Sequence, residues 1–327
     1  GHNAVSIDPA IRRVRLAGGA TLPYTRLVLA TGSRAIRLNV PGMDLPGVLT
    51  FRDLGDVANI EKAASKHRNA VVVGGGLLGL EAAYGLAKLG VSVAVVHLMD
   101  RLMERQLDPH ASDLLKQAVG RRGIAVHLNA ETTAIRGKSR VEEVALRDGT
   151  VLPADLVVVA AGIVPNVGLA RSADLAVNRG VVVDDTMQTS RADIYAIGEC
   201  AEHRGVCYGL VEPAYEQADV LAAQLSGRRA HYAGSIVATN LKVSGVNVFS
   251  AGNFLSGADT EQILLTDPSL GAYKKLVLKE GRLAGAVLFG DTADASWYLD
   301  LIRSGAPIAA IRNDMMFGQA IAERAAA

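Results

Sequence analysis

Cysteine, excess charge and long apolar runs are all scarce in this chain of 327 residues. Cys200 and Cys207 are the only two cysteines, and their spacing fits neither a disulfide framework nor a cysteine metal site. The formal net charge of +1 argues against nucleic acid or a membrane surface as a partner. No apolar run approaches the roughly 18 residues that span a bilayer, and no signal peptide opens the chain. We therefore expect a cytoplasmic protein.

Aromatic residues are also few, at 4%, although half of all residues are hydrophobic. Short runs of Val, Ile, Leu and Ala alternate with glycine, a pattern typical of parallel strands buried on both faces. The length allows two or three domains with well-buried cores. Together these features predict an α/β fold.

The most informative segment is Val71–Gly90, which predicts a strand, a glycine turn and the start of a helix. In G-x-G-x-x-G, the first glycine permits the tight bend, the second lets the backbone approach a pyrophosphate, and the third lets the helix pack on the strand. Val91–Val96 then supplies the second strand of a βαβ unit. We predict a dinucleotide site on the free N–H groups of this turn, formed by Gly74, Gly75, Gly76, Leu77, Leu78 and Gly79.

Elsewhere the patterns predict short strands in the first 30 residues, a helix over 109–119 and a hairpin over 141–151. Helices are expected over 213–225 and 293–303, and the last hundred residues read as a separate α+β module. Three apolar strands end at small residues, at Thr31-Gly32, Ala161-Gly162 and Gly198-Glu199. Ligands of α/β proteins bind just beyond such strand ends.

These three strand ends around a dinucleotide loop resemble the two-dinucleotide flavoprotein reductases, the pyridine nucleotide-disulphide oxidoreductase family. In that family an A-T-G-S/T segment, here Ala30–Ser33, leads from the FAD domain to the NAD domain, and an A/T-G-x-x-P segment, here Ala161–Pro165, leads back. A Y-A-x-G-D segment carries an acid to the FAD ribityl chain, and Tyr195–Glu199 matches it with Glu in place of Asp. Four further stretches resemble the flavoprotein portion of the assimilatory NAD(P)H nitrite reductase large subunit: 96–108, 198–205, 208–213 and 290–298.

The resemblance implies Rossmann-like FAD and NAD(P) domains, of three-layer ββα form, followed by an α+β interface domain. The boundaries it implies are 1–48 and 167–230 for the FAD domain, 49–166 for the NAD(P)H domain and 231–327 for the dimerisation domain. It also implies FAD and NAD(P)H as cofactors. The cofactor-binding residues that it implies at the three strand ends are Ala30, Thr31, Gly32, Ala161, Gly162, Gly198 and Glu199, with Glu199 as the contact to FAD.

The nicotinamide side leaves two questions open. The resemblance implies that Glu81 faces the nicotinamide pocket. An equally good interpretation is an acid that stabilises the N-terminus of its helix through the helix dipole. His97 stands where an acid normally binds the ribose of NAD. With Arg101 and Arg105 it could accept the 2′-phosphate of NADPH, but Asp100 and Glu104 dilute that charge, so NADH and NADPH both remain candidates.

The family's own N-terminal glycine fingerprint for FAD does not occur in the sequence. We therefore expect an FAD domain that is incomplete at the N-terminus, as in a truncated or split chain, with weakened FAD binding. No catalytic triad is expected because the cofactors carry the chemistry. The scattered histidines lack metal spacing, so no metal site is predicted, and Cys200 is read as a buried structural thiol.

The function implied is an NAD(P)H-dependent, FAD-containing oxidoreductase. It would pass electrons to an iron-sulfur and sirohaem nitrite reductase domain or to a small redox protein, as a homodimer. A rubredoxin or ferredoxin reductase is the alternative within the same fold. A catalytically silent module that binds nucleotide and dimerises is the alternative from a different class.

Overall fold

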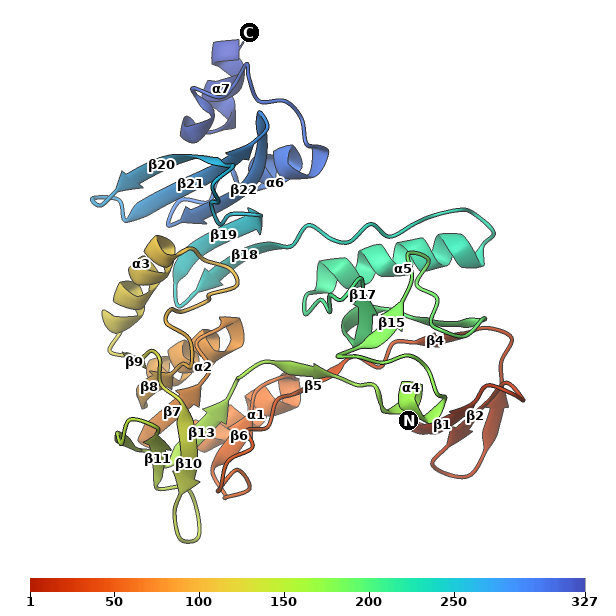
Figure 1. The fold of residues 1–327 in the computed structure, drawn as a ribbon. Coiled ribbons are helices and arrows are strands. Elements are labelled where there is room, and N and C mark those ends of the chain that lie inside the picture. Colours follow the sequence, from red (N-terminus) through yellow and green to blue (C-terminus); the bar gives the residue numbers. More distant parts are fainter. Residues whose placement is uncertain (327) are drawn as a thin grey trace. The chain divides into compact units, whose positions relative to one another are not determined.

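The computed structural model describes residues 1–326 and groups them into two compact units (Figure 1). Unit 1 consists of residues 1–35 and 163–235, and unit 2 consists of residues 36–162 and those from 236 onward. The chain therefore leaves unit 1 after Ala35 and returns to it at Ile163.

Unit 1 is built from small sheets and one long helix. Its first three strands form an antiparallel meander, β4 pairs with β16 in parallel, β5 pairs with β14, and β15 pairs with β17 (Figure 1). The strands are β1 (Ala4–Asp8), β2 (Arg13–Leu16), β3 (Thr21–Pro23), β4 (Leu27–Leu29), β5 (Ser33–Ala35), β14 (Ile163–Pro165), β15 (Val181–Val183), β16 (Ile194–Ala196) and β17 (Ala201–His203). The helices are α4 (Gly168–Ser172), a 3₁₀ turn over Gly198–Cys200 and α5 (Val211–Leu225).

The first part of unit 2 is a five-stranded parallel sheet in the order β6-β13-β7-β8-β9. Its strands are β6 (Val48–Thr50), β7 (Asn69–Val73), β8 (Ser92–Val96), β9 (Ala125–His127) and β13 (Leu156–Val159). The sheet order reverses at β7, whose neighbours are β8 and β13, and ligands bind at such a switch point in α/β sheets. This arrangement confirms the predicted α/β fold with a Rossmann-like nucleotide-binding domain.

Three helices accompany this sheet: α1 (Leu54–Ala64), α2 (Leu77–Lys88) and α3 (Pro109–Gly120). The predicted helix over 109–119 is confirmed, because the Asp108 side chain caps it by accepting the Ala111 N–H at 3.0 Å and Pro109 occupies its first turn. The predicted hairpin belongs to a small antiparallel sheet of β10 (Thr132–Arg136), β11 (Glu143–Leu146) and β12 (Val151–Pro153).

The C-terminal part of unit 2 is a five-stranded antiparallel sheet in the order β18-β19-β22-β21-β20, with helices packed on it (Figure 1). Its strands are β18 (Ala238–Val243), β19 (Val246–Gly252), β20 (Glu261–Asp267), β21 (Ala272–Lys279) and β22 (Arg282–Phe289). The helices are α6 (Ala295–Ser304), a 3₁₀ turn over Met315–Phe317 and α7 (Gln319–Ala326).

The two parts of unit 2 share one apolar core. Val248, Tyr273, Val287 and Phe289 of the antiparallel sheet join the cluster that holds the buried side chains of α2 and α3. A buried polar contact supports this joint: the Tyr273 hydroxyl donates to Asp108 Oδ2 at 2.7 Å, and Lys275 Nζ lies 3.4 Å from the same oxygen. The domain boundaries predicted from the sequence, at 1–48, 49–166, 167–230 and 231–327, stay a prediction.

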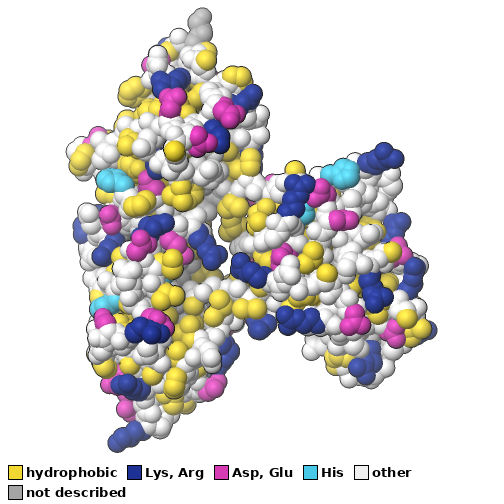
Figure 2. All heavy atoms as spheres, viewed as in Figure 1, with side chains coloured by type: hydrophobic (Ala, Val, Ile, Leu, Met, Phe, Trp, Pro, Cys, Tyr) yellow, Lys and Arg dark blue, Asp and Glu magenta, His cyan; other side chains and the backbone are white. Residues whose placement is uncertain are grey.

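On the face shown in Figure 2, basic and acidic side chains are mixed over the surface of both units, in keeping with the net charge of +1. Within residues 1–326, no helix combines the length and the apolar character that crossing a membrane requires.

Candidate functional site

The glycine loop after β7 is shaped by close backbone packing at two of its glycines. A Cβ on Gly79 would lie 1.9 Å from the Gly74 carbonyl oxygen, and one on Gly74 would lie 2.2 Å from the carbonyl oxygen of Ala160. Gly74 also has φ of +128°, a conformation that side chains other than glycine rarely adopt. These two glycines therefore let β7, β13 and the start of α2 approach one another closely.

Gly76 differs from its neighbours because a Cβ there would meet no atom of the described residues within 4 Å. It is the N-cap of α2, where no side chain accepts a hydrogen bond from the first helical N–H groups. Gly76, Leu77 and Leu78 are all partly exposed. The start of α2 thus offers backbone donors and open space, which is the environment that a pyrophosphate requires.

His97 lies beneath this loop and holds it. Its Nδ1 accepts the Gly75 N–H at 3.0 Å, its Nε2 lies 3.1 Å from Glu104 Oε2, and the residue is only 8% exposed. Because Nδ1 is the acceptor, Nε2 carries the proton and donates to the carboxylate, so the ring is neutral in this arrangement. The structure gives His97 a role in positioning the loop, and a contact with the nucleotide stays a prediction.

Four other predicted residues lie in unit 2 outside the loop itself. Arg101 donates through Nη1 to Asp100 Oδ1 at 3.0 Å, while its buried Nε has no partner among the described residues. Glu81 is exposed on α2 and lines a pocket of about 370 Å³ between α1 and α2. Ala161 and Gly162 are exposed just beyond β13, and the Ala161 nitrogen would lie 3.3 Å from a Cβ on Gly74.

Five of the predicted cofactor-binding residues, Ala30, Thr31, Gly32, Gly198 and Glu199, gather at one edge of unit 1, whereas Ala161 and Gly162 belong to unit 2. Because β4 and β16 are parallel neighbours, their carboxyl ends bring the segments after Leu29 and Ala196 together. There the Ser33 hydroxyl donates to Glu199 Oε2 at 2.7 Å. Gly198, at φ of +75°, opens the 3₁₀ turn that carries Glu199. The two motifs, 166 residues apart in sequence, thus meet through a direct side-chain contact.

Two residues that hold this edge were not predicted. The Thr31 hydroxyl donates to the Asn166 carbonyl at 2.6 Å, and Asn166 Nδ2 donates to the Thr31 carbonyl at 2.9 Å. Gln217 accepts the Gly198 N–H through Oε1 at 2.7 Å. Gln217 is 1% exposed and stands four residues after buried Pro213 on α5. A polar residue at a position of the helix that is otherwise apolar is the sequence pattern that could have indicated a buried hydrogen bond here.

The cysteines are structural in character. Cys200 is fully buried as predicted, with its thiol 3.3 Å from the Ile197 carbonyl and 3.5 Å from that of Leu29. Burial raises the pKa of the Cys207 thiol, and the Glu202 carboxylate adds to this effect. Neither cysteine forms a disulfide. Among residues 1–326, no group of three or more His, Cys, Asp or Glu side chains is arranged to hold a metal ion.

Comparison with known proteins places this geometry in a family. Residues 1–224 match the pyridine nucleotide-disulphide oxidoreductase family, and residues 238–306 match the rubredoxin NAD+ reductase C-terminal domain. The chain is 46% identical to nitrite reductase [NAD(P)H] of Bacillus subtilis over 94% of its own length and 38% of that protein. It is 30% identical to NADH-rubredoxin oxidoreductase of Clostridium acetobutylicum, over 89% of this chain and 72% of that one.

A crystal structure of a ferredoxin reductase from Rhodopseudomonas palustris has the same fold, with a TM-score of 0.86 and 31% identity over all of this chain and 81% of that one. The chain spans only 32% to 39% of the length of the bacterial nitrite and nitrate reductase relatives. The resemblance found in the motifs is confirmed, and the chain belongs to the pyridine nucleotide-disulphide oxidoreductase family.

Proposed function

We propose that this chain is the NAD(P)H- and FAD-binding part of a cytoplasmic oxidoreductase of the nitrite reductase large-subunit type. The observation that carries the nucleotide assignment is the open space at Gly76, beside an α2 N-terminus that no side chain caps. Similarity to nitrite reductase [NAD(P)H] and to an assimilatory nitrate reductase electron transfer subunit, both of Bacillus subtilis, supports the reaction class.

The residues present fit both cofactors. The N–H groups at Leu77 and Leu78 would hold the pyrophosphate of the nicotinamide nucleotide, where the helix dipole favours negative charge. Glu199, oriented by Ser33, would accept hydrogen bonds from hydroxyl groups of FAD. When bound, these groups supply hydride transfer from nicotinamide to flavin and release of single electrons to an acceptor. The protein's own contribution is to position both cofactors.

Flavin retention tests the proposal directly. After incubation with FAD and removal of the excess, the purified chain should retain absorbance near about 450 nm, which is typical of oxidised flavin. Glu199→Gln should lower the amount retained because it removes the charged acceptor, whereas Asp219→Asn, an exposed position on α5, should not. A colourless wild type would favour the silent nucleotide-binding module.

The electron acceptor is tested by turnover. With FAD bound, NADH should reduce ferricyanide but not nitrite, because the proposed nitrite chemistry belongs to an iron-sulfur and sirohaem partner. Direct reduction of nitrite by the chain alone would contradict this division of labour. The match of residues 238–306 to the rubredoxin NAD+ reductase C-terminal domain favours rubredoxin as a second candidate acceptor. If the chain reduces rubredoxin faster than it reduces the iron-sulfur partner, rubredoxin is the acceptor.

We propose Arg101 as the residue that decides between the two nicotinamide nucleotides, since its buried Nε has no partner among the described residues. A 2′-phosphate bound there would make Arg101→Gln lose NADPH affinity by about tenfold while NADH affinity stays unchanged. Equal losses for both nucleotides would reject a phosphate contact.

The proposed homodimer is checked by sedimentation of the flavin-loaded protein.

A further inference from the structure

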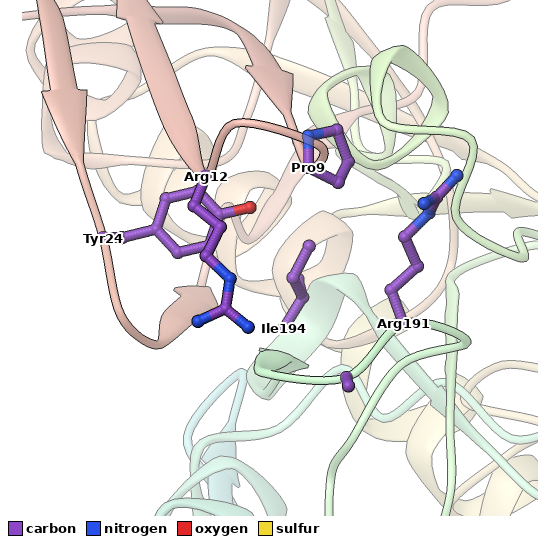
Figure 3. Close-up of a pocket in the computed structure, with 6 residues that line it drawn as sticks. Pro9, Arg12, Tyr24, Arg191 and Ile194 are labelled. Carbon is purple, nitrogen blue, oxygen red and sulfur yellow. The ribbon is translucent and has the colours of Figure 1, made fainter.

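A second candidate binding site lies in unit 1, at the opposite ends of the strands that carry the flavin residues. It is a pocket of about 240 Å³ lined by Pro9, Arg12, Tyr24, Arg191, Ala192 and Ile194 (Figure 3). Tyr24 precedes β4, and Arg191 precedes β16, so the pocket sits at the amino ends of this parallel pair. Ser33 and Glu199, whose contact marks the predicted FAD edge, follow the carboxyl ends of these two strands, so the two sites are separate.

The side chains of the pocket are rich in hydrogen-bond donors. The Arg191 side chain is exposed and makes no hydrogen bond or ion pair with other described residues. The buried Tyr24 hydroxyl also has no partner among the described residues. In Figure 3 it points into the space between Arg12 and Arg191. Burial raises the pKa of the Tyr24 phenol, so it keeps its proton at neutral pH and can donate.

The nearby carboxylates are already engaged. Asp193 Oδ2 accepts from Arg12 Nη2 at 2.7 Å, and Asp8 Oδ1 accepts the N–H groups of Ala10 and Ile11 at 3.0 and 3.3 Å. Among the described residues Arg12 uses one of its five N–H donors, on Nη2, in the contact with Asp193, so four remain. The pocket therefore has unused N–H donors on Arg12 and Arg191, beside a carboxylate, that of Asp193, which is already paired with Arg12.

The backbone at the rim holds this arrangement in place. Arg12 and Asp193 have φ of +52° and +62°, in the left-handed region that non-glycine residues seldom adopt. Such conformations persist where the surrounding structure fixes them, and they concentrate at ligand sites. The Asp193 carbonyl also accepts the N–H of Leu27 at 2.8 Å, which ties the rim to the first residue of β4.

We propose that this pocket binds a small phosphoryl oxyanion, held by Arg191, Arg12 and the Tyr24 hydroxyl. Two guanidinium groups offer paired N–H donors that match the oxygens of a phosphate. The phenol hydroxyl adds a third hydrogen-bond donor. The volume is sufficient for one such group but not for a dinucleotide. Free inorganic phosphate and the phosphate of a small monoester share this chemistry.

The test is isothermal titration of the full chain with inorganic phosphate at constant ionic strength. Wild type should show saturable binding, and Arg191→Gln and Tyr24→Phe should each weaken it about tenfold, the factor expected for one charge-assisted hydrogen bond. Arg179→Gln, at an exposed arginine of the same unit that does not line the pocket, should stay within about twofold of wild type. Absence of saturable binding below about 10 mM, or an equal loss in Arg179→Gln, would overturn the proposal.

Two further readouts complete the test. Tyr24→Phe should unfold at the same denaturant concentration as wild type or at a higher one, because the lost hydroxyl has no partner within the described residues. A clear loss of stability would mean that the hydroxyl is already bonded inside the protein, and would contradict a spare donor. Titration with ethyl phosphate separates the two sources: tighter binding than inorganic phosphate identifies a phosphorylated metabolite, and weaker binding identifies the free anion.

Discussion

Three glycines at the start and middle of α2 should respond to the same substitution in three different ways. In Gly79→Ala, the added Cβ would lie 1.9 Å from the Gly74 carbonyl oxygen, so β7 and α2 must separate. Overpacking of this kind costs about 3 kcal/mol of the free energy of unfolding. In Gly85→Ala, the Cβ meets nothing within 4 Å among the described residues, and the helix should gain about 0.5 to 1 kcal/mol.

Gly76→Ala separates binding from folding. Its Cβ would enter open space, and alanine is a poorer N-cap than glycine by only about 0.5 kcal/mol, so the fold should be nearly unaffected. The same methyl group would occupy the space proposed for the pyrophosphate, and NADH affinity should fall about tenfold or more, which is about 1.4 kcal/mol.

Urea unfolding and NADH fluorescence titration, run on all three variants, check these expectations. Gly85→Ala is the matched control, since it should bind NADH like wild type and be slightly more stable. If Gly76→Ala binds NADH with wild-type affinity, the nucleotide does not lie on this loop. If Gly79→Ala unfolds at the wild-type urea concentration, the close packing of β7 and α2 does not hold in solution.

Two other predictions concern polar contacts away from the loop. Tyr273→Phe should lower the free energy of unfolding by about 1 to 3 kcal/mol because the buried Asp108 loses a donor, whereas Tyr215→Phe, at an exposed residue, should change nothing measurable in urea unfolding. Arg204, and after it His203, lowers the pKa of Asp185 from 3.8 to about 2, so its stabilising effect is present above pH 4 and is lost as pH falls to 2. Urea midpoints at pH 7, 4 and 2 should therefore fall less steeply in Asp185→Asn, and an unchanged slope would exclude this contribution.

The elements that follow from local sequence were predictable. The strand, turn and helix of Val71–Gly90 correspond to β7, the glycine loop and α2, because helical and strand periodicities depend on near neighbours in sequence. The helix beginning at Pro109 was equally clear, since proline and a preceding aspartate mark a helix start. Two of the strand ends that share small residues, at Thr31-Gly32 and Gly198-Glu199, also come together in the structure, while their binding of a ligand stays a prediction.

The contacts that hold the sites were not predictable, because they join residues far apart in sequence. Nothing local to His97 indicates that its ring accepts the N–H of Gly75, which depends on the adjacent placement of β7 and β8. The same is true of Gln217, whose contact with Gly198 requires α5 to lie against the 3₁₀ turn. The pocket at Tyr24 arises from three separate turns, none of which has a recognisable motif.

The apolar core shared by the two parts of unit 2 has a thermodynamic consequence. Because Val248, Val287 and Phe289 pack into the cluster that also contains the buried side chains of α2 and α3, the antiparallel sheet and the Rossmann-like sheet should open in one cooperative step. A ligand bound at the start of α2 stabilises that whole step by mass action. Saturation with NADH should then slow amide hydrogen exchange in β19 and β22, although neither strand belongs to the loop that is proposed to hold the nucleotide.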